Sequence, residues 1–205
     1  MTKRLYIAGI DEIPQYSTLE VADKLKVTIV CPPGYNGVVN FGIDILRPGV
    51  ELDIAGVYFC TRGEKQRLNI SVRHLSEGAS SRQLFKGVLA RGGSMVFDGL
   101  IHVAPGAAGT KAVQENHSIL LDSESTAETH PQLEIYADDV ECSHGATTGF
   151  LSAEEQFYMR SRGIPEAEAR VLQMISFLSP VLARISDEGE RERLAAEVEA
   201  AVRSL

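Results

Sequence analysis

The sequence predicts a mainly β protein followed by a small α-helical region, and three observations support this prediction. Short segments with the alternating apolar pattern of strands succeed one another through most of the chain, punctuated by glycine or proline. No helix period separates them. Glycine is frequent before residue 150 and rare after it. We therefore assign residues 1–150 to a β region and residues 151–205 to a C-terminal helical region.

The β segments can be assigned in order along the chain, although residues 1–26 are hard to interpret. Residues 5–8 suit a short strand, and residues 16–26 suit either a strand or a turn of helix. The last segment begins at Leu133, and its alternation continues to His144 before Gly145 ends it. Between them the expected strands are residues 27–31, 37–42, 51–59, 67–75, 84–90, 94–103 and 118–121.

Many short strands of this kind form a sandwich, a barrel or a β-solenoid. Two features favour the solenoid. No Asn-Gly or Asp-Gly pair joins two alternating runs as a tight hairpin would. Residues 76–82 and 104–110 are small and polar, and suit loops between successive turns of a coil. No exact internal repeat is visible, so the pattern alone leaves the three folds open.

The C-terminal region contains three helical segments. Ser152 and Glu155 form a capping-box pattern at the start of the first, which covers residues 152–162, and Gly163 is a good stop signal. Residues 165–179 carry an apolar stripe at helical spacing, and Pro180 is expected to kink or restart that helix. Residues 191–205 form a last amphipathic helix.

Composition excludes several classes of protein. The 205-residue chain is 44% hydrophobic, which is enough for a core, but it has no apolar run long enough to span a membrane. Its net charge of −8 argues against binding nucleic acid. Three cysteines make no disulfide framework, which together with the lack of a signal sequence suits the cytoplasm. The sequence contains no glycine-rich phosphate loop, so we do not expect this chain to bind ATP itself.

Cys142 and His144 are the sharpest chemical feature. Two residues apart on a strand, they share one face, where a thiolate and an imidazole can hold iron or zinc. From spacing alone, a buried cysteine beside a hydrogen-bonded histidine is the simpler interpretation. Cys31 and Cys60 lie in apolar strands and are most simply core residues.

Residues 133–147 read Leu-Glu-Ile-Tyr-Ala-Asp-Asp-Val-Glu-Cys-Ser-His-Gly-Ala-Thr, and residues 157–164 read Phe-Tyr-Met-Arg-Ser-Arg-Gly-Ile. Both resemble the C-terminal part of the SufB/SufD family, the scaffold subunits of SUF iron–sulfur cluster assembly. The Cys-Ser-His-Gly spelling is closer to SufD. The resemblance implies a right-handed parallel β-helix, which decides among the three folds, and a non-enzymatic role.

The resemblance also implies roles for individual residues. In SufD the histidine of this motif faces a SufB cysteine across the subunit interface, a role that falls here to His144, with Cys142 as a second participant. A transient iron–sulfur cluster is expected between chains, because one chain has too few ligands. The residues that resemble the contact with a SufC-type ABC ATPase are Phe157, Tyr158, Arg160, Arg162 and Gly163.

The chain is about half the usual family length, so it resembles an N-terminally shortened member. We expect it to pair through its β-helix with a SufB-like paralogue or, without one, with itself as a homodimer. The alternatives are an interaction protein that binds the ATPase without cluster chemistry and, more distantly, a cysteine-dependent enzyme using Cys142 and His144. A slowly reacting, buried thiol would argue against the enzyme.

Overall fold

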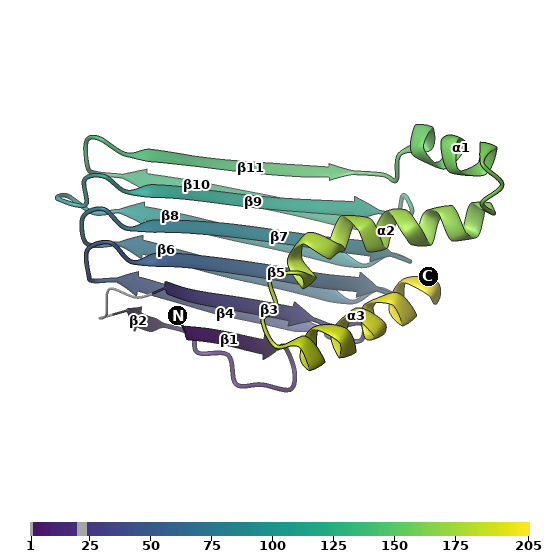
Figure 1. Ribbon diagram of the computed structural model, residues 1–205, viewed down its shortest axis with the longest axis horizontal. Coiled ribbons are helices and arrows are strands. Elements are labelled where there is room, and N and C mark those ends of the chain that lie inside the picture. The colour runs from purple at the N-terminus through teal and green to yellow at the C-terminus, as the bar shows by residue number, and fades with distance from the viewer. Residues whose placement is uncertain (1, 20–23) are drawn as a thin grey trace.

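The computed structural model describes residues 2–19 and 24–205, and most of them belong to a coil of parallel strands (Figure 1). The chain passes alternately between two sheets, so each strand pairs with the strand two positions later. Every described pairing is parallel. The fold is therefore a parallel β-solenoid, which confirms one of the three architectures that the strand pattern allowed.

Among the described residues, sheet A contains six strands and sheet B contains five. In spatial order, the strands of sheet A are β1 (Thr2–Ile7), β3 (Lys24–Cys31), β5 (Glu51–Thr61), β7 (Ser80–Ala90), β9 (Lys111–Leu120) and β11 (Glu141–Gly149). Those of sheet B are β10 (Thr126–Ile135), β8 (Ser94–Val103), β6 (Lys65–His74), β4 (Gly37–Ile45) and β2 (Ser17–Leu19). The expected segment 16–26 falls partly outside the described residues.

The hydrophobic core lies between the two sheets. Alternate residues of β6 and β8 are buried, as expected for strands with one face inside. In-register neighbours stack from turn to turn, and Leu68 on β6 lies beside Phe97 on β8. Both side chains are fully buried, as are Cys31 and Cys60, which confirms that these two cysteines belong to the core.

Glycines in the left-handed backbone region mark one corner of the coil at a constant interval. Gly34, Gly63 and Gly92 all have positive φ and lie 29 residues apart. Arg62 and Arg91, which precede two of them, also have positive φ. Because residues with a Cβ rarely adopt this conformation, these positions record a repeat of one turn that side-chain identities do not show.

The single strand expected from Leu133 to His144 is wrong. The chain forms β10 up to Ile135 and resumes as β11 at Glu141, in the other sheet. Asp139 has a φ of 55°, and its carbonyl accepts a hydrogen bond from the Gly109 amide on the turn below. Apolar residues on both sides of this turn pack into one cluster, so the alternation continues through a corner that it does not reveal.

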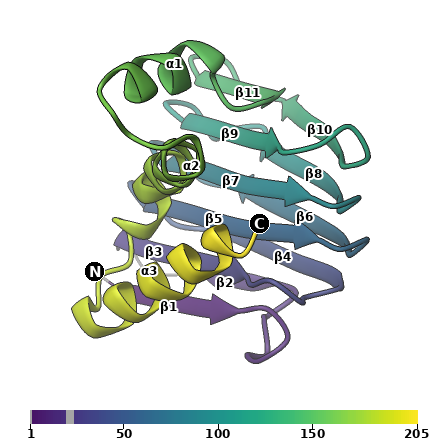
Figure 2. The same ribbon diagram turned by 90° about the vertical axis from the view of Figure 1, so that its right-hand side faces the viewer.

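Three helices follow the solenoid: α1 (Ala153–Ser161), α2 (Glu166–Leu182) and α3 (Glu188–Arg203). Buried residues of α2 and α3 share a hydrophobic cluster with the outer face of sheet A, including Val57 on β5, Val88 on β7, Leu178 on α2 and Leu194 on α3. Figure 2 shows these helices on the sheet A side, and no helix of the described residues covers sheet B.

Local signals explain the helix ends. The Ser152 hydroxyl accepts from the Glu155 amide, as the capping box requires, but the Glu155 carboxylate accepts from Gln173 on α2 instead of completing the box.

Pro180 lies within α2. Proline has no amide proton to offer the Ser176 carbonyl, and the Ser179 hydroxyl donates to that carbonyl instead.

Removing the N-cap of α3 is expected to lower the free energy of unfolding by about 1 kcal/mol. The Asp187 carboxylate accepts a 2.8 Å hydrogen bond from the Glu190 amide, which otherwise has no partner within the helix. Urea unfolding of Asp187→Ala measures the loss. Asp187→Asn keeps the acceptor and should retain most of the stability; equal stability in all three proteins contradicts the prediction.

Candidate functional site

The last turn of the solenoid, formed by β10 and β11, is here called the open end. β10 and β11 are the outermost strands of sheets B and A, and each pairs on one side only among the described residues. Figure 1 shows this turn at the top of the coil, away from β1 and β2. The inward residues of the open end are therefore accessible, whereas their counterparts on lower turns are covered.

Cys142 and His144 both face the interior at the open end. In register, Cys142 lies above Ala112 and His144 above Gln114, and these two β9 side chains are buried inside the coil. The opposite face is marked by Thr147, whose hydroxyl bonds to His117 on the outer surface. Cys142 is half-buried and His144 is exposed. The prediction that the two residues share a face holds, although the expected strand bounds were wrong.

The surroundings of Cys142 favour the protonated form of its thiol. It packs beside the apolar cluster that contains Ile101, Val103 and Ala112, and this burial raises its pKa, while a hydrogen bond with the Ala112 backbone opposes the rise. A catalytic thiol needs the reverse shift, because the thiolate is the nucleophile. A metal ion that binds here would have to displace the proton.

A layer of buried polar side chains lies directly below the open end. The Gln114 amide donates to the Gln83 carbonyl oxygen at 2.8 Å, and the Asn116 carbonyl oxygen accepts from the Tyr58 hydroxyl at 3.0 Å. The Asn116 amide donates to the Thr129 hydroxyl, which links β9 to β10. These residues were not identified from the sequence, although the alternation of Gln114 and Asn116 on one strand was a visible signal.

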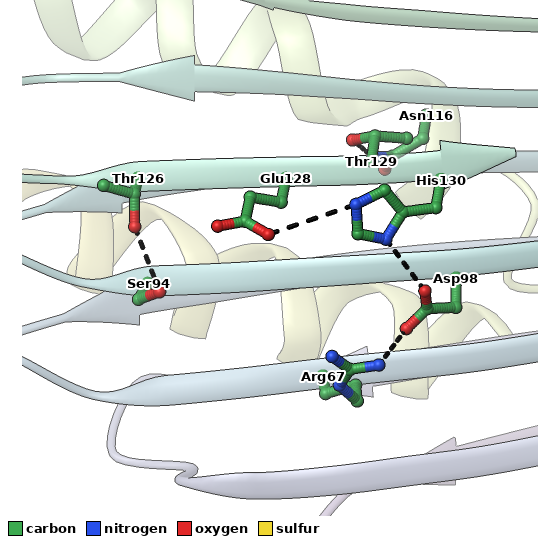
Figure 3. A network of polar contacts seen from close by, with 8 residues as sticks. All are labelled: Arg67, Ser94, Asp98, Asn116, Thr126, Glu128, Thr129 and His130. Atoms are coloured by element: carbon green, nitrogen blue, oxygen red, sulfur yellow. Dashed lines mark hydrogen bonds and ion pairs between the residues drawn. The ribbon is translucent and has the colours of Figure 1, made fainter.

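Figure 3 shows the two faces of β10 at this level. Thr129 points to Asn116 inside the coil, whereas His130 points out and bonds to Asp98 at 2.9 Å. Asp98 also pairs with Arg67 on the next strand. The His130 network therefore ties neighbouring strands together on the outer face of sheet B, separate from the inward-facing Cys142 and His144.

The other two cysteines do not contribute to this site. The Cys60 thiol donates to the carbonyl oxygens of Glu64 and Ser94, each at 3.1 Å, and burial raises its pKa to about 11. Burial raises the pKa of Cys31 to about 12. Within residues 2–19 and 24–205, no group of three or more His, Cys, Asp or Glu side chains is arranged to hold a metal ion.

The candidate partner-binding residues lie on α1 and just beyond it. Phe157 and Tyr158 are 74% and 60% exposed, and the Arg162 guanidinium lies over the Tyr158 ring at 5.3 Å. Arg160 pairs with Glu166, and Gly163 ends the helix region with a φ of 88°. This surface adjoins a groove of about 600 Å³ lined by Glu154, Glu155, Tyr158, Met159, Leu172, Gln173 and Ser176.

The structure does not bring the two candidate sites together. Cys142 and His144 are near the start of β11, whereas α1 begins beyond its end (Figure 1). At about 3.3 Å per residue, the strand separates them by roughly 20 Å or more. A role for both sites in one process therefore requires communication along the strand or through a bound partner.

Residues 19–177 match the family described as "SUF system FeS cluster assembly, SufBD core domain". The chain belongs to the SufBD family. This SufBD-family protein has the β-solenoid that the resemblance in its motifs implied, and the matched region includes the whole open end and α1. The family is described by its part in the SUF system of iron–sulfur cluster assembly.

Three relatives illustrate the extent of the similarity. The protein is 39% identical to the iron–sulfur cluster assembly protein SufD of Escherichia coli over 62% of its chain. It is 31% identical to a SufBD family protein of Mycobacterium tuberculosis over 78%, and 29% identical to one of Staphylococcus epidermidis over 66%. These matches cover 30%, 43% and 29% of the relatives, so the chain spans less than half of their length.

None of the described helices is long and apolar enough to cross a membrane.

Proposed function

We propose that this protein is a non-enzymatic scaffold subunit on which a SUF-type iron–sulfur cluster is assembled at the open end. The observation that supports the proposal most directly is that Cys142 and His144 share the inward face of β11, an edge strand whose inner side is accessible at the open end. Thiolate sulfur and imidazole nitrogen are both ligands that iron accepts in clusters. The raised pKa of the Cys142 thiol disfavours the alternative of a cysteine-dependent enzyme.

The cluster is cargo, and its ligands come from two chains. Clusters take four protein ligands, so Cys142 and His144 supply half of a set. Among the described residues, no strand pairs with the outer edge of β10 or β11, and such an edge favours pairing with the strands of another chain. Ile135, Tyr136 and Phe150 expose apolar surface at the same end. We infer a homodimer, or a heterodimer with a SufB-like paralogue, joined through the open end.

A SufC-type ABC ATPase is the proposed second partner, and α1 is its contact. Phe157 and Tyr158 are large aromatic side chains, and most of their surface is left exposed by the described residues. Exposed aromatic residues beside a groove are typical of protein interfaces. ATP-driven movement of the ATPase would then change the geometry of the dimer and expose or cover the cluster ligands.

Anaerobic reconstitution with iron and sulfide tests the cluster chemistry. Wild-type protein should develop a visible charge-transfer band, and Cys142→Ala and His144→Ala should each reduce it severalfold or abolish it. His102→Ala is the matched control, because His102 lies on the outer face of sheet B and bonds to Glu134. A band that needs neither Cys142 nor His144 would refute the assignment of ligands.

The ATPase contact is tested separately by pull-down with a SufC-type protein. Phe157→Ala with Tyr158→Ala should weaken binding, whereas Tyr16→Ala, an exposed aromatic residue outside α1 and outside the open end, should not. If no reconstitution band forms while this binding persists, the protein is an interaction subunit without cluster chemistry. Equal binding by both variants would remove α1 from the interface.

A further inference from the structure

We propose that Gln114 positions His144, its side-chain oxygen Oε1 accepting a hydrogen bond from one ring N–H of the histidine. The other ring nitrogen is then left with its lone pair directed to the open end. This inference rests on the proposed function, in which His144 is an iron ligand. It adds a specific role for a buried amide that the ligand assignment does not include.

The first observation is a polar atom without a partner. Gln114 is 1% exposed, and its Nε2 donates to Gln83, but within the described residues its Oε1 has no hydrogen-bond partner. A buried carbonyl oxygen without a donor costs about 1–3 kcal/mol. A donor that approaches from the accessible side therefore has a free-energy reason to bind there.

The second observation is where the Gln114 amide lies. A Cβ added to Gly99 would be only 2.0 Å from Gln114 Oε1, so the side chain crosses the interior from β9 and its oxygen rests on the β8 backbone. The residue above Gly99 in register is Pro131, which has no amide proton. The residue above Gln114 itself is His144. Of these two residues on the turn above, only His144 has an N–H that it can donate to Gln114 Oε1.

The distance between turns allows the contact. In-register residues on neighbouring strands lie about 4.8 Å apart, and their side chains point to the same face. His144 is exposed, and no hydrogen bond holds its ring to any other described residue. Rotation about its side-chain bonds is therefore free to bring one N–H over the Gln114 amide. Cys142, two residues earlier, stacks on Ala112 and leaves this acceptor open.

The chemical consequence is a single neutral tautomer of His144. A histidine that binds metal usually donates its other ring N–H to an oxygen, which orients the ring and selects the nitrogen that binds. An amide oxygen does this without adding a charge to the site. Below Gln114, Gln83 occupies the equivalent position one turn deeper and is equally buried, but it lies two turns below His144, with Gln114 between them.

Selective ¹⁵N-histidine labelling tests the hydrogen bond without any metal. In two-bond ¹H–¹⁵N spectra at alkaline pH, the His144 signals, assigned by their loss in His144→Gln, should show one protonated and one unprotonated ring nitrogen. Gln114→Met should move both nitrogen shifts towards their average, because the tautomers then interconvert. Gln83→Met is the matched control, since it breaks the same amide–amide bond but leaves Gln114 Oε1 in place. Averaged shifts in the wild type, or unchanged shifts in Gln114→Met, overturn the proposal.

Binding of ferrous iron alone, under anaerobic conditions, gives the second measurement. Loss of a residue that orients a metal ligand weakens metal affinity by about 10–100-fold, which is expected for Gln114→Met and not for Gln83→Met. Equal losses in both variants would assign Gln114 a merely structural role. The two proposals fail separately. A single tautomer that depends on Gln114 in a protein that binds no iron upholds the positioning and refutes the function. Averaged tautomers in a protein that assembles clusters uphold the function and refute the positioning.

Discussion

Replacement of Tyr58 by alanine is expected to lower the free energy of unfolding by about 4 kcal/mol, as for other buried aromatic residues. The Tyr58 ring is fully buried between the sheets and lies so close to Gly87 that a Cβ there would be 1.8 Å from the ring. Its hydroxyl bonds to Asn116 at 3.0 Å and Ser118 at 2.8 Å. The substitution removes packing from the core and leaves two buried polar groups without this partner.

Two further variants separate these contributions. Tyr58→Phe keeps the ring and should cost about 1–3 kcal/mol, the penalty for unsatisfied buried polar groups. Phe157→Ala removes an aromatic side chain that is 74% exposed and should change stability by no more than about 0.5 kcal/mol. Urea unfolding followed by circular dichroism provides all three values. If Tyr58→Phe were as stable as the wild type, the hydroxyl would not stabilise the polar layer.

Acid should destabilise the protein through His74, by up to about 3 kcal/mol between pH 6.5 and pH 4. The imidazole is fully buried, with Ile45 and Val103 as its neighbours in register, and its Nε2 bonds to the Ser81 hydroxyl at 2.9 Å. Burial lowers its pKa to about 4, because the charged form is poorly solvated inside the coil.

The sign follows from proton binding in the two states. Above about pH 6.5 His74 is neutral whether the chain is folded or unfolded, so its full contribution is present. As the pH falls towards 4, the unfolded chain binds a proton that the folded chain does not, and stability is lost. Unfolding free energies at pH 7 and pH 4 measure this loss.

His74→Gln should reduce the pH dependence by about 3 kcal/mol, since glutamine does not titrate in this range. Ser81→Ala is the matched control. It removes the hydrogen-bond partner of His74 and lowers stability at every pH, but it retains most of the pH dependence. A variant at position 74 with the wild-type pH dependence would show that other groups cause the acid sensitivity.

The strand predictions are most accurate where the apolar residues of the alternating pattern are also the residues that point into the core. Segments 51–59 and 94–103 correspond to β5 and β8, whose inward residues are apolar and whose ends carry turn residues. Segment 133–144 failed because a corner at Asp139 joins two strands that contribute to the same apolar cluster. Alternation reports which residues are inside, but it does not report which sheet holds them.

The candidate site was predicted in part for the same reason. Cys142 and His144 are two residues apart, so the period of a strand was sufficient to place them on one face. Gln114 was not recognised, because it meets the level of His144 only through pairing of β9 with β11, 30 residues later in the chain. In the sequence, the 29-residue spacing of the glycines at 34, 63 and 92 is the signal for one turn of the coil.

The sequence by itself determined the β region, the three helices, the buried cysteines and the shared face of Cys142 and His144. Each of these depends on hydrogen bonds or side-chain periods within about ten residues of chain. Only the tertiary structure decided that the strands coil into two parallel sheets, that α2 and α3 cover sheet A, and that the coil ends at β10 and β11. These features arise from contacts between turns about 30 residues apart, which local periodicity does not encode. The exposed position of His144 above a buried amide is one of them.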